Sequence, residues 1–97
     1  MAKGYWITFY HSVSNPAALA EYAKLASPAI QAGGGRFIVR GTPVKTYEAG
    51  LDQRTVVIEF DSVQSAVATF ESPEYSAARK ILEGAAERDI RILEGSS

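Results

Sequence analysis

Apolar side chains alternate along the first stretch of the chain in a way that predicts a β-strand. Residues 4–13 contain aromatic or β-branched residues at every position from 5 to 10, so both alternating faces are apolar. One face would carry Tyr5, Ile7 and Phe9, and the other Trp6, Thr8 and Tyr10. Such a strand is expected to be covered on both sides.

A helix is predicted directly after this strand. Asn15 suits the N-cap and Pro16 the first helical position. Helical spacing then relates Leu19, Tyr22, Ala23, Ala26 and Ile30, and the glycines 33–35 end the helix. Pro28 is expected to kink this helix or to split off its last turn, because it removes one hydrogen bond.

Two further strands are predicted over residues 36–45 and 53–60, joined by a polar connection. In the first, Phe37 and Val39 would face one way, and Ile38 and Arg40 the other. In the second, Val56, Ile58 and Phe60 alternate with Thr55, Val57 and Glu59. Arg36, Arg40 and Glu59 are unexpected in buried strands, since an unpaired buried ion costs several kcal/mol. They predict ion pairs or a cavity.

The second half of the chain repeats this pattern more loosely. Asp61 or Ser62 would cap a short helix running to Phe70, and the sequence Ser-Pro-Glu at 72–74 begins another that runs to Leu82. Residues 88–94 form a fourth predicted strand, with Ile90 and Ile92 opposite Arg91 and Leu93. The resulting order is βαββαβ.

This order predicts a single ferredoxin-like α+β domain over residues 1–97, with a four-stranded antiparallel sheet. Right-handed crossovers place the helices on one face and leave the other face open. The open face is predicted to carry Trp6, Thr8, Tyr10, Ile38, Arg40, Thr55, Val57, Glu59 and Leu93. Because this mixture is too apolar to face water, we expect a homodimer of the α/β-barrel kind, with a pocket between the two sheets.

Composition limits the class of partner. Ten basic and eleven acidic residues leave a net charge of −1, and the charges are interspersed, which disfavours nucleic-acid or membrane binding. The chain has no cysteine, so a reducing compartment is compatible. The first residues lack the apolar core of a signal peptide, and no apolar run reaches the ~18 residues of a membrane span. We therefore expect a cytoplasmic location.

Six short segments stand in order along the chain: KGYWI, GGGRFIVRG, the Glu48 and Gly50 pair, RTVVIEF, SPEY and IRILEG. Together they resemble the domain of unknown function 1330 family of small, mostly bacterial proteins, over nearly the whole chain. The resemblance implies a dimeric α/β barrel, similar in shape to cofactor-free monooxygenases, with no established activity. The positions inside the matching motifs are Arg40, Glu48, Arg54, Glu59 and Tyr75. Tyr47 departs from the smaller aliphatic residue that the family often has there.

Two charged pairs are candidates for the site. Arg40 and Glu59 would form either a cross-strand ion pair or part of a ligand site, in which Arg40 holds a carboxylate and Glu59 acts as general base. Glu48 and Arg54 flank the connection, where a loop-closing ion pair is the simpler interpretation than catalysis, although both remain ligand-binding candidates.

The remaining candidates are aromatic residues and the only histidine. His11 is either a rim residue or a second catalytic candidate. Trp6 and Tyr10 would form interface or pocket walls, and Tyr75 would either anchor its helix or direct its hydroxyl to the cavity. We expect no metal site, since a lone histidine has no carboxylate cluster, and no cofactor. Glycines 33–35 follow a helix, so they do not form a phosphate loop.

Three function classes follow from these residues. The first is a cofactor-free enzyme, monooxygenase- or isomerase-like, acting on a compact organic acid or aromatic compound. The second is a non-catalytic ligand-binding or assembly module with the same pocket. The third is an RNA binder with this strand order, which the sequence disfavours because it lacks the basic-glycine-aromatic strand motif.

Overall fold

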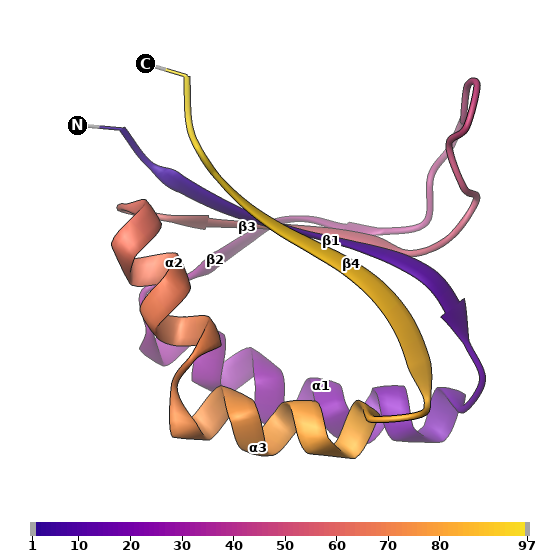
Figure 1. Cartoon of the computed structure of the whole chain (residues 1–97), viewed down its shortest axis with the longest axis horizontal. Coiled ribbons are helices and arrows are strands. Elements are labelled where there is room, and N and C mark those ends of the chain that lie inside the picture. The colour runs from indigo at the N-terminus through magenta and orange to yellow at the C-terminus, as the bar shows by residue number, and fades with distance from the viewer. Residues whose placement is uncertain (1, 97) are drawn as a thin grey trace.

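Four antiparallel strands form one sheet in the order β2-β3-β1-β4, in a computed structural model that describes residues 2–96. The strands are β1 (Gly4–Val13), β2 (Arg36–Gly41), β3 (Thr55–Phe60) and β4 (Ala86–Glu94). The helices are α1 (Pro16–Ala32), α2 (Val63–Phe70) and α3 (Pro73–Leu82). In Figure 1 all three helices lie below one face of the sheet, and the other face is bare. The predicted ferredoxin-like α+β fold is confirmed.

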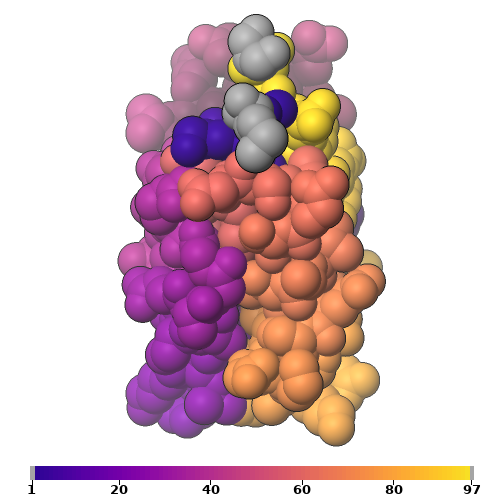
Figure 2. All heavy atoms as spheres, turned by 90° about the vertical axis from the view of Figure 1, so that its left-hand side faces the viewer, coloured from indigo at the N-terminus to yellow at the C-terminus, as the bar shows by residue number. Residues whose placement is uncertain are grey.

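Side-chain caps begin the helices where the sequence predicts them. The side chains of Asn15, Ser62 and Ser72 accept hydrogen bonds from backbone N–H groups in the first turns of α1, α2 and α3. The helices then pack on one another as well as on the sheet, and Figure 2 shows α1 lying against α2 and α3. None of the helices within residues 2–96 is long and apolar enough to cross a membrane.

Helix α1 continues through Pro28 to Ala32, so Pro28 does not split off the last turn, and of the two predicted effects only a kink stays a prediction. The turn after Pro28 is held in two ways. Ala29 and Ile30 are buried against the core, and the N–H groups of residues 33–35 donate back to carbonyls of this last turn. These bonds and contacts offset the one hydrogen bond that proline removes.

The assignment of faces along β1 is the reverse of the predicted one. Trp6, Thr8 and Tyr10 lie on the helix side, where Trp6 is 1% exposed and packs against Phe60, Phe70 and Tyr75. The Trp6 Nε1–H group donates to Thr8 Oγ1 at 2.9 Å, so neither polar atom is left unpaired. Both faces of β1 are apolar, and alternation alone therefore could not decide which one meets the helices.

A bulge in β2 changes the predicted faces of that strand. Phe37 lies opposite Ile58 and Val39 lies opposite Val57, so Ile38 is an extra residue without a partner on β3. Phe37 and Val39 consequently face opposite sides, and Arg40, opposite the buried Val56, turns toward the helices. The predicted placement of Arg40 on the open face is wrong, because the extra residue of the bulge interrupts the regular alternation of side chains between the two faces of the sheet.

The connection between β2 and β3, residues 42–54, is longer than predicted and leaves the sheet. We call it the arm. In Figure 1 it stands up from one end of the open face, on the side away from the helices. Three of its large apolar side chains are exposed, namely Val44, Tyr47 and Leu51.

Candidate functional site

The candidate site is a small cavity between α1 and the helix-facing side of the sheet. Its volume is about 60 Å³, enough for a few water molecules or one end of a compact molecule. Aromatic side chains of β1, α1 and β2 form much of its wall, and these are Trp6, Tyr10, Tyr22 and Phe37. The sequence predicted a pocket on the open face instead. The cavity lies on the helix side because Trp6, Tyr10 and Arg40 all turn that way.

Two arginines stand at the open side of this cavity. Arg40 is exposed and lies over the Phe37 ring, with its Cζ atom 4.4 Å from the ring centroid. Arg54 is half-buried just before β3, where its carbonyl accepts from the Tyr10 N–H group at 3.0 Å. Among residues 2–96, no carboxylate lies within 4.0 Å of either guanidinium group. Both positive charges are therefore available to an anion.

The inner end of the cavity adjoins a cluster of phenol groups and one guanidinium group. Tyr22 comes from α1, Tyr75 from α3 and Arg88 from β4. The two hydroxyl groups are 2.6 Å apart, and Arg88 Nη1 donates to Tyr22 at 3.0 Å and to Tyr75 at 3.4 Å. The Arg88 Cζ atom also lies 5.0 Å from the centroid of the Tyr22 ring and 5.7 Å from that of Tyr10. A charge held by aromatic rings and phenol oxygens is stabilised without a carboxylate.

Sequence reasoning missed Tyr22 and Arg88 as polar elements of the site. The helical spacing identifies Tyr22 only as an apolar position of its helix. A signal for Arg88 was present, since it shares a strand face with Ile90 and Ile92, at intervals of two residues. A cation on that apolar face has to be paired inside the protein. The prediction that Tyr75 anchors α3 agrees with its complete burial against Trp6.

Burial also affects the titration of the phenols beside the cavity. It raises the pKa of Tyr10 and of Tyr22 above the ordinary phenol value of 10.0. Both hydroxyl groups therefore keep their protons at neutral pH and remain hydrogen-bond donors.

Glu59 lies on the open face, apart from this cavity. Arg36 is its cross-strand neighbour, and two of the Arg36 nitrogens donate to Glu59 Oε1 at 3.1 and 3.2 Å. The Tyr5 hydroxyl donates to Glu59 Oε2 at 2.9 Å. The hydrogen bonds from Tyr5 and Arg36 lower the pKa of this carboxyl group. The predicted Arg40–Glu59 pair is wrong, because the bulge turns Arg40 to the other side of the sheet.

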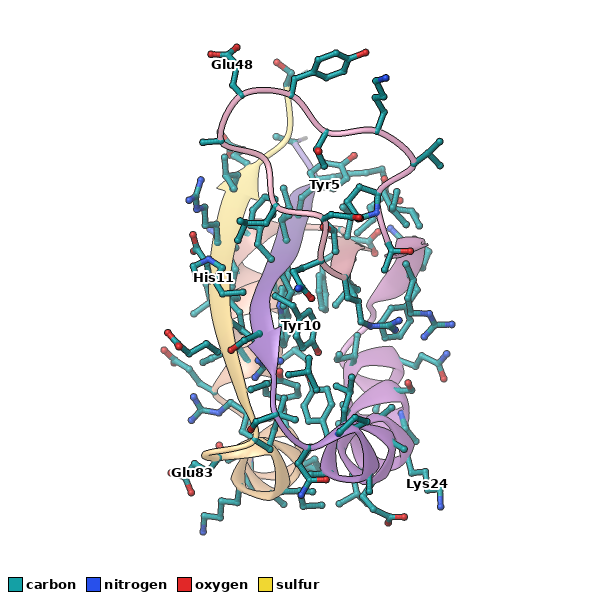
Figure 3. All side chains as sticks on the ribbon, turned by 90° about the vertical axis from the view of Figure 1, so that its right-hand side faces the viewer. Tyr5, Tyr10, His11, Lys24, Glu48 and Glu83 are labelled. Atoms are coloured by element: carbon teal, nitrogen blue, oxygen red, sulfur yellow. The ribbon has the colours of Figure 1, made fainter. Side chains whose placement is uncertain are left out.

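Two other predicted site residues, Glu48 and His11, lie on the open side. In Figure 3 Glu48 lies at the top of the arm, Tyr5 on the arm side of the sheet, and Tyr10 between the sheet and the helices. Glu48 and Arg54 form no ion pair within 4.0 Å in the described part of the chain. His11 is exposed and lines a hollow of about 250 Å³ with Asp89 and Arg91. Catalytic roles for Glu59 and His11 stay predictions.

A comparison with protein families assigns the chain to one of them. The model of the family described as "Domain of unknown function (DUF1330)" matches residues 3–96. The chain belongs to this family. No curated protein matches the sequence of this DUF1330 chain.

Solved structures similar to the DUF1330 chain share its fold at low sequence identity. A protein of unknown function from Rhodopseudomonas palustris, RPA0582, is 16% identical in its methylated form, with a TM-score of 0.74, over 99% of this chain and 82% of that one. A dimeric ferredoxin-like protein of unknown function from Thermobifida fusca is 17% identical, with a TM-score of 0.66, over 97% and 92% of the two chains.

A third similar structure has a name that suggests an activity. It is a candidate antibiotic biosynthesis monooxygenase from Nitrosomonas europaea, 20% identical with a TM-score of 0.63, over 97% and 99% of the two chains. At these identities the similarity establishes the fold of the DUF1330 chain and no activity.

Proposed function

We propose that this protein binds a compact organic acid, with an aromatic or other flat apolar body, in the cavity between α1 and the sheet. The observation that carries the proposal is the combination of aromatic walls with two arginines, Arg40 and Arg54, that have no carboxylate partner among residues 2–96. Guanidinium groups match carboxylates in geometry and charge. The apolar body would enter the aromatic part, while the acid group would stay at the open side.

We further propose that the chain forms a homodimer through the open face. Ile7, Phe9 and Val57 are only half-buried there, and Val39 and Leu93 are exposed. The apolar side chains of the arm stand on the same side. A second copy would cover these groups together, which matches the description of the Thermobifida fusca neighbour as dimeric. The hollow beside His11 would then lie next to the interface.

Catalysis without a cofactor, monooxygenase- or isomerase-like, is a second candidate for the same cavity. It is favoured by the protonated phenols of Tyr10 and Tyr22 in the cavity wall, since such donors stabilise negative charge that develops on a substrate oxygen, and Arg88 donates to the Tyr22 oxygen from behind. The Nitrosomonas europaea neighbour has a name of this class, but what it shares with this chain is the fold alone. The alternative is a non-catalytic binding or assembly module.

Binding of benzoate and of other compact carboxylates, followed by NMR titration, tests the proposal. Replacing Arg54 by Ala removes a charge-assisted hydrogen bond worth about 1.5–3 kcal/mol, so we expect affinity to fall roughly 10- to 150-fold. Arg40→Ala should act in the same direction but less, because Arg40 is more exposed. The matched control is Lys24→Ala, which removes one positive charge from the exposed side of α1.

The outcome separates the candidate functions. Affinities that do not change in either arginine variant would refute the cavity as the binding site. Turnover of a bound compound by the parent protein, lost in Arg54→Ala and retained in Lys24→Ala, would favour the enzyme. Binding without turnover across the panel would favour the module.

A further inference from the structure

The hydrogen bond between the Tyr22 and Tyr75 hydroxyl groups has a direction that their surroundings determine. Tyr75 is 0% exposed, and within residues 2–96 its oxygen has only two hydrogen-bond partners, the Tyr22 hydroxyl at 2.6 Å and Arg88 Nη1 at 3.4 Å. A guanidinium group can only donate. The proton of Tyr75 therefore has one acceptor available, which is the oxygen of Tyr22.

The oxygen of Tyr22 consequently accepts two hydrogen bonds, one from Tyr75 and one from Arg88 Nη1 at 3.0 Å. A phenol oxygen has room for two acceptor contacts and carries one proton of its own. That proton finds no acceptor among the described residues, although Tyr22 is only 8% exposed. Tyr22 lines the cavity, whereas Tyr75 and Arg88 do not, which leaves the cavity as the space from which an acceptor can reach this proton.

Tyr10 supplies a second donor to the same place. It is 3% exposed, it lines the cavity, and its hydroxyl donates a hydrogen bond to no residue between 2 and 96. The guanidinium group of Arg88 faces the rings of both Tyr10 and Tyr22. Because burial raises the pKa of both phenols, the two protons stay in place at neutral pH.

We propose that Tyr22, assisted by Tyr10, donates a hydrogen bond to a carbonyl or oxyanion oxygen at the inner end of the bound ligand. This inference rests on the proposed function and deepens it: the ligand carries an acid group toward Arg40 and Arg54 and an oxygen acceptor at its other end. Tyr75 and Arg88 are positioning residues, since they occupy the two acceptor directions of Tyr22 and leave only its proton for the ligand. A ligand without that oxygen leaves a buried donor unpaired, which gives the site its specificity.

Neutron diffraction from crystals of the deuterium-exchanged protein tests the hydrogen-bond directions without any ligand. The expected result is the Tyr75 deuteron on the line to the Tyr22 oxygen, with the Tyr22 deuteron directed into the cavity. A Tyr22 deuteron on the line to the Tyr75 oxygen overturns the inference. This measurement gives an answer even if the proposed function is wrong.

A pair of benzoates tests the ligand class. We expect 4-acetylbenzoate to bind more tightly than 4-isopropylbenzoate, which has the same number of non-hydrogen atoms, with a methyl group in place of the carbonyl oxygen. Tyr22→Phe should weaken binding of the ketone roughly 3- to 10-fold, as expected for the loss of one hydrogen bond, and leave the affinity for the isopropyl compound unchanged. Tyr47→Phe, on the exposed arm, is the control and should change neither.

Two further readouts separate a specific donor from a loss of structure. The carbon-13 signal of the labelled ketone carbonyl should move downfield on binding to the parent protein and much less in Tyr22→Phe. Tyr75→Phe should reduce this shift while the ketone still binds. Without the Tyr75 hydroxyl, the Tyr22 hydroxyl can rotate, so its proton points at the ketone oxygen for less of the time. Equal losses for both benzoates in Tyr22→Phe overturn the ligand class. If neither benzoate binds the parent protein, the ligand class is overturned as well, together with the proposed function of binding a compact organic acid.

Discussion

Both faces of this sheet carry polar groups among apolar side chains, and these groups are stabilised differently on the two faces. On the helix face, Trp6 donates to Thr8, and Arg88 donates to two phenols, so the polar groups are neutral or share their charge with aromatic rings. On the open face, Glu59 is paired with Arg36 and remains partly accessible to water. Aromatic content is similar on both sides of β1. What distinguishes the faces is whether their polar groups can be satisfied within one chain without a salt bridge.

The largest difference between the faces should appear on truncating an aromatic side chain. Trp6→Ala should lower the free energy of unfolding by about 3–5 kcal/mol, because it leaves a cavity at the centre of the core. Tyr5→Ala, on the adjacent position of the open face, should cost less than half as much at low protein concentration. Urea denaturation measures both, and equal costs would show that the open face is as tightly packed in one chain as the core.

The second test asks whether the open face is covered by another copy. Val57→Lys would place an unpaired charge from each chain in the interface, so we expect self-association to weaken by roughly 100-fold or more. Sedimentation equilibrium over a wide concentration range measures this. Gln64→Lys adds the same charge to the exposed side of α2 and should leave association unchanged. A parent protein that sediments only as one chain at high concentration would remove the homodimer.

Two threonines give a smaller, matched comparison. Thr8→Val leaves the buried Trp6 Nε1–H group without its acceptor and should cost about 1–3 kcal/mol. Thr55 lies on the open face and donates only to the Gln53 carbonyl at 3.3 Å, so Thr55→Val should change stability by about 0.5 kcal/mol or less. Thermal and urea unfolding should rank the two variants in this order. The reverse ranking would contradict the internal pairing of Trp6.

The smallest effect is the pH dependence contributed by Glu59. Its pKa is lowered in the folded protein, so its stabilisation is present above the unfolded-state value of about 4.3 and is lost as the pH falls below it. The difference in urea midpoint between the parent and Glu59→Gln should therefore be constant near neutral pH and shrink below about pH 4. The exposed Glu87 serves as control, and Glu87→Gln should follow the parent. A difference that stays constant down to pH 3 would contradict the Tyr5 and Arg36 contacts.

The order of the elements could be predicted from sequence because its signals are local. The predicted bounds of β1, residues 4–13, are those observed, and the Asn15–Pro16 and Ser72–Pro73 pairs mark the starts of α1 and α3. Each signal is a cap or an alternation within a few residues, where neighbouring side chains decide the backbone conformation. The βαββαβ order then leaves few topologies to consider.

The candidate site could be predicted only in its residue types. Arg40, Arg54, Trp6 and Tyr10 do line one cavity, but on the other side of the sheet. Its location depends on which face of β1 meets the helices and on the bulge in β2, and both result from packing between distant strands. The contacts of Arg88 join residues 13 and 66 positions away, beyond the reach of any local pattern.

Ile38, the extra residue of the bulge, has a consequence for how the chain tolerates change in length. Without Ile38, positions 36, 37, 39, 40 and 41 would stand opposite 59, 58, 57, 56 and 55 in an uninterrupted ladder. Each of these side chains would keep its present side of the sheet. Deleting Val39 or Arg40 instead removes a residue that pairs with β3. The neighbouring side chains of β2 would then point to the opposite faces of the sheet, unless the bulge were lost as well. Shortened relatives that keep an arginine over this cavity are therefore expected to have lost the residue at position 38.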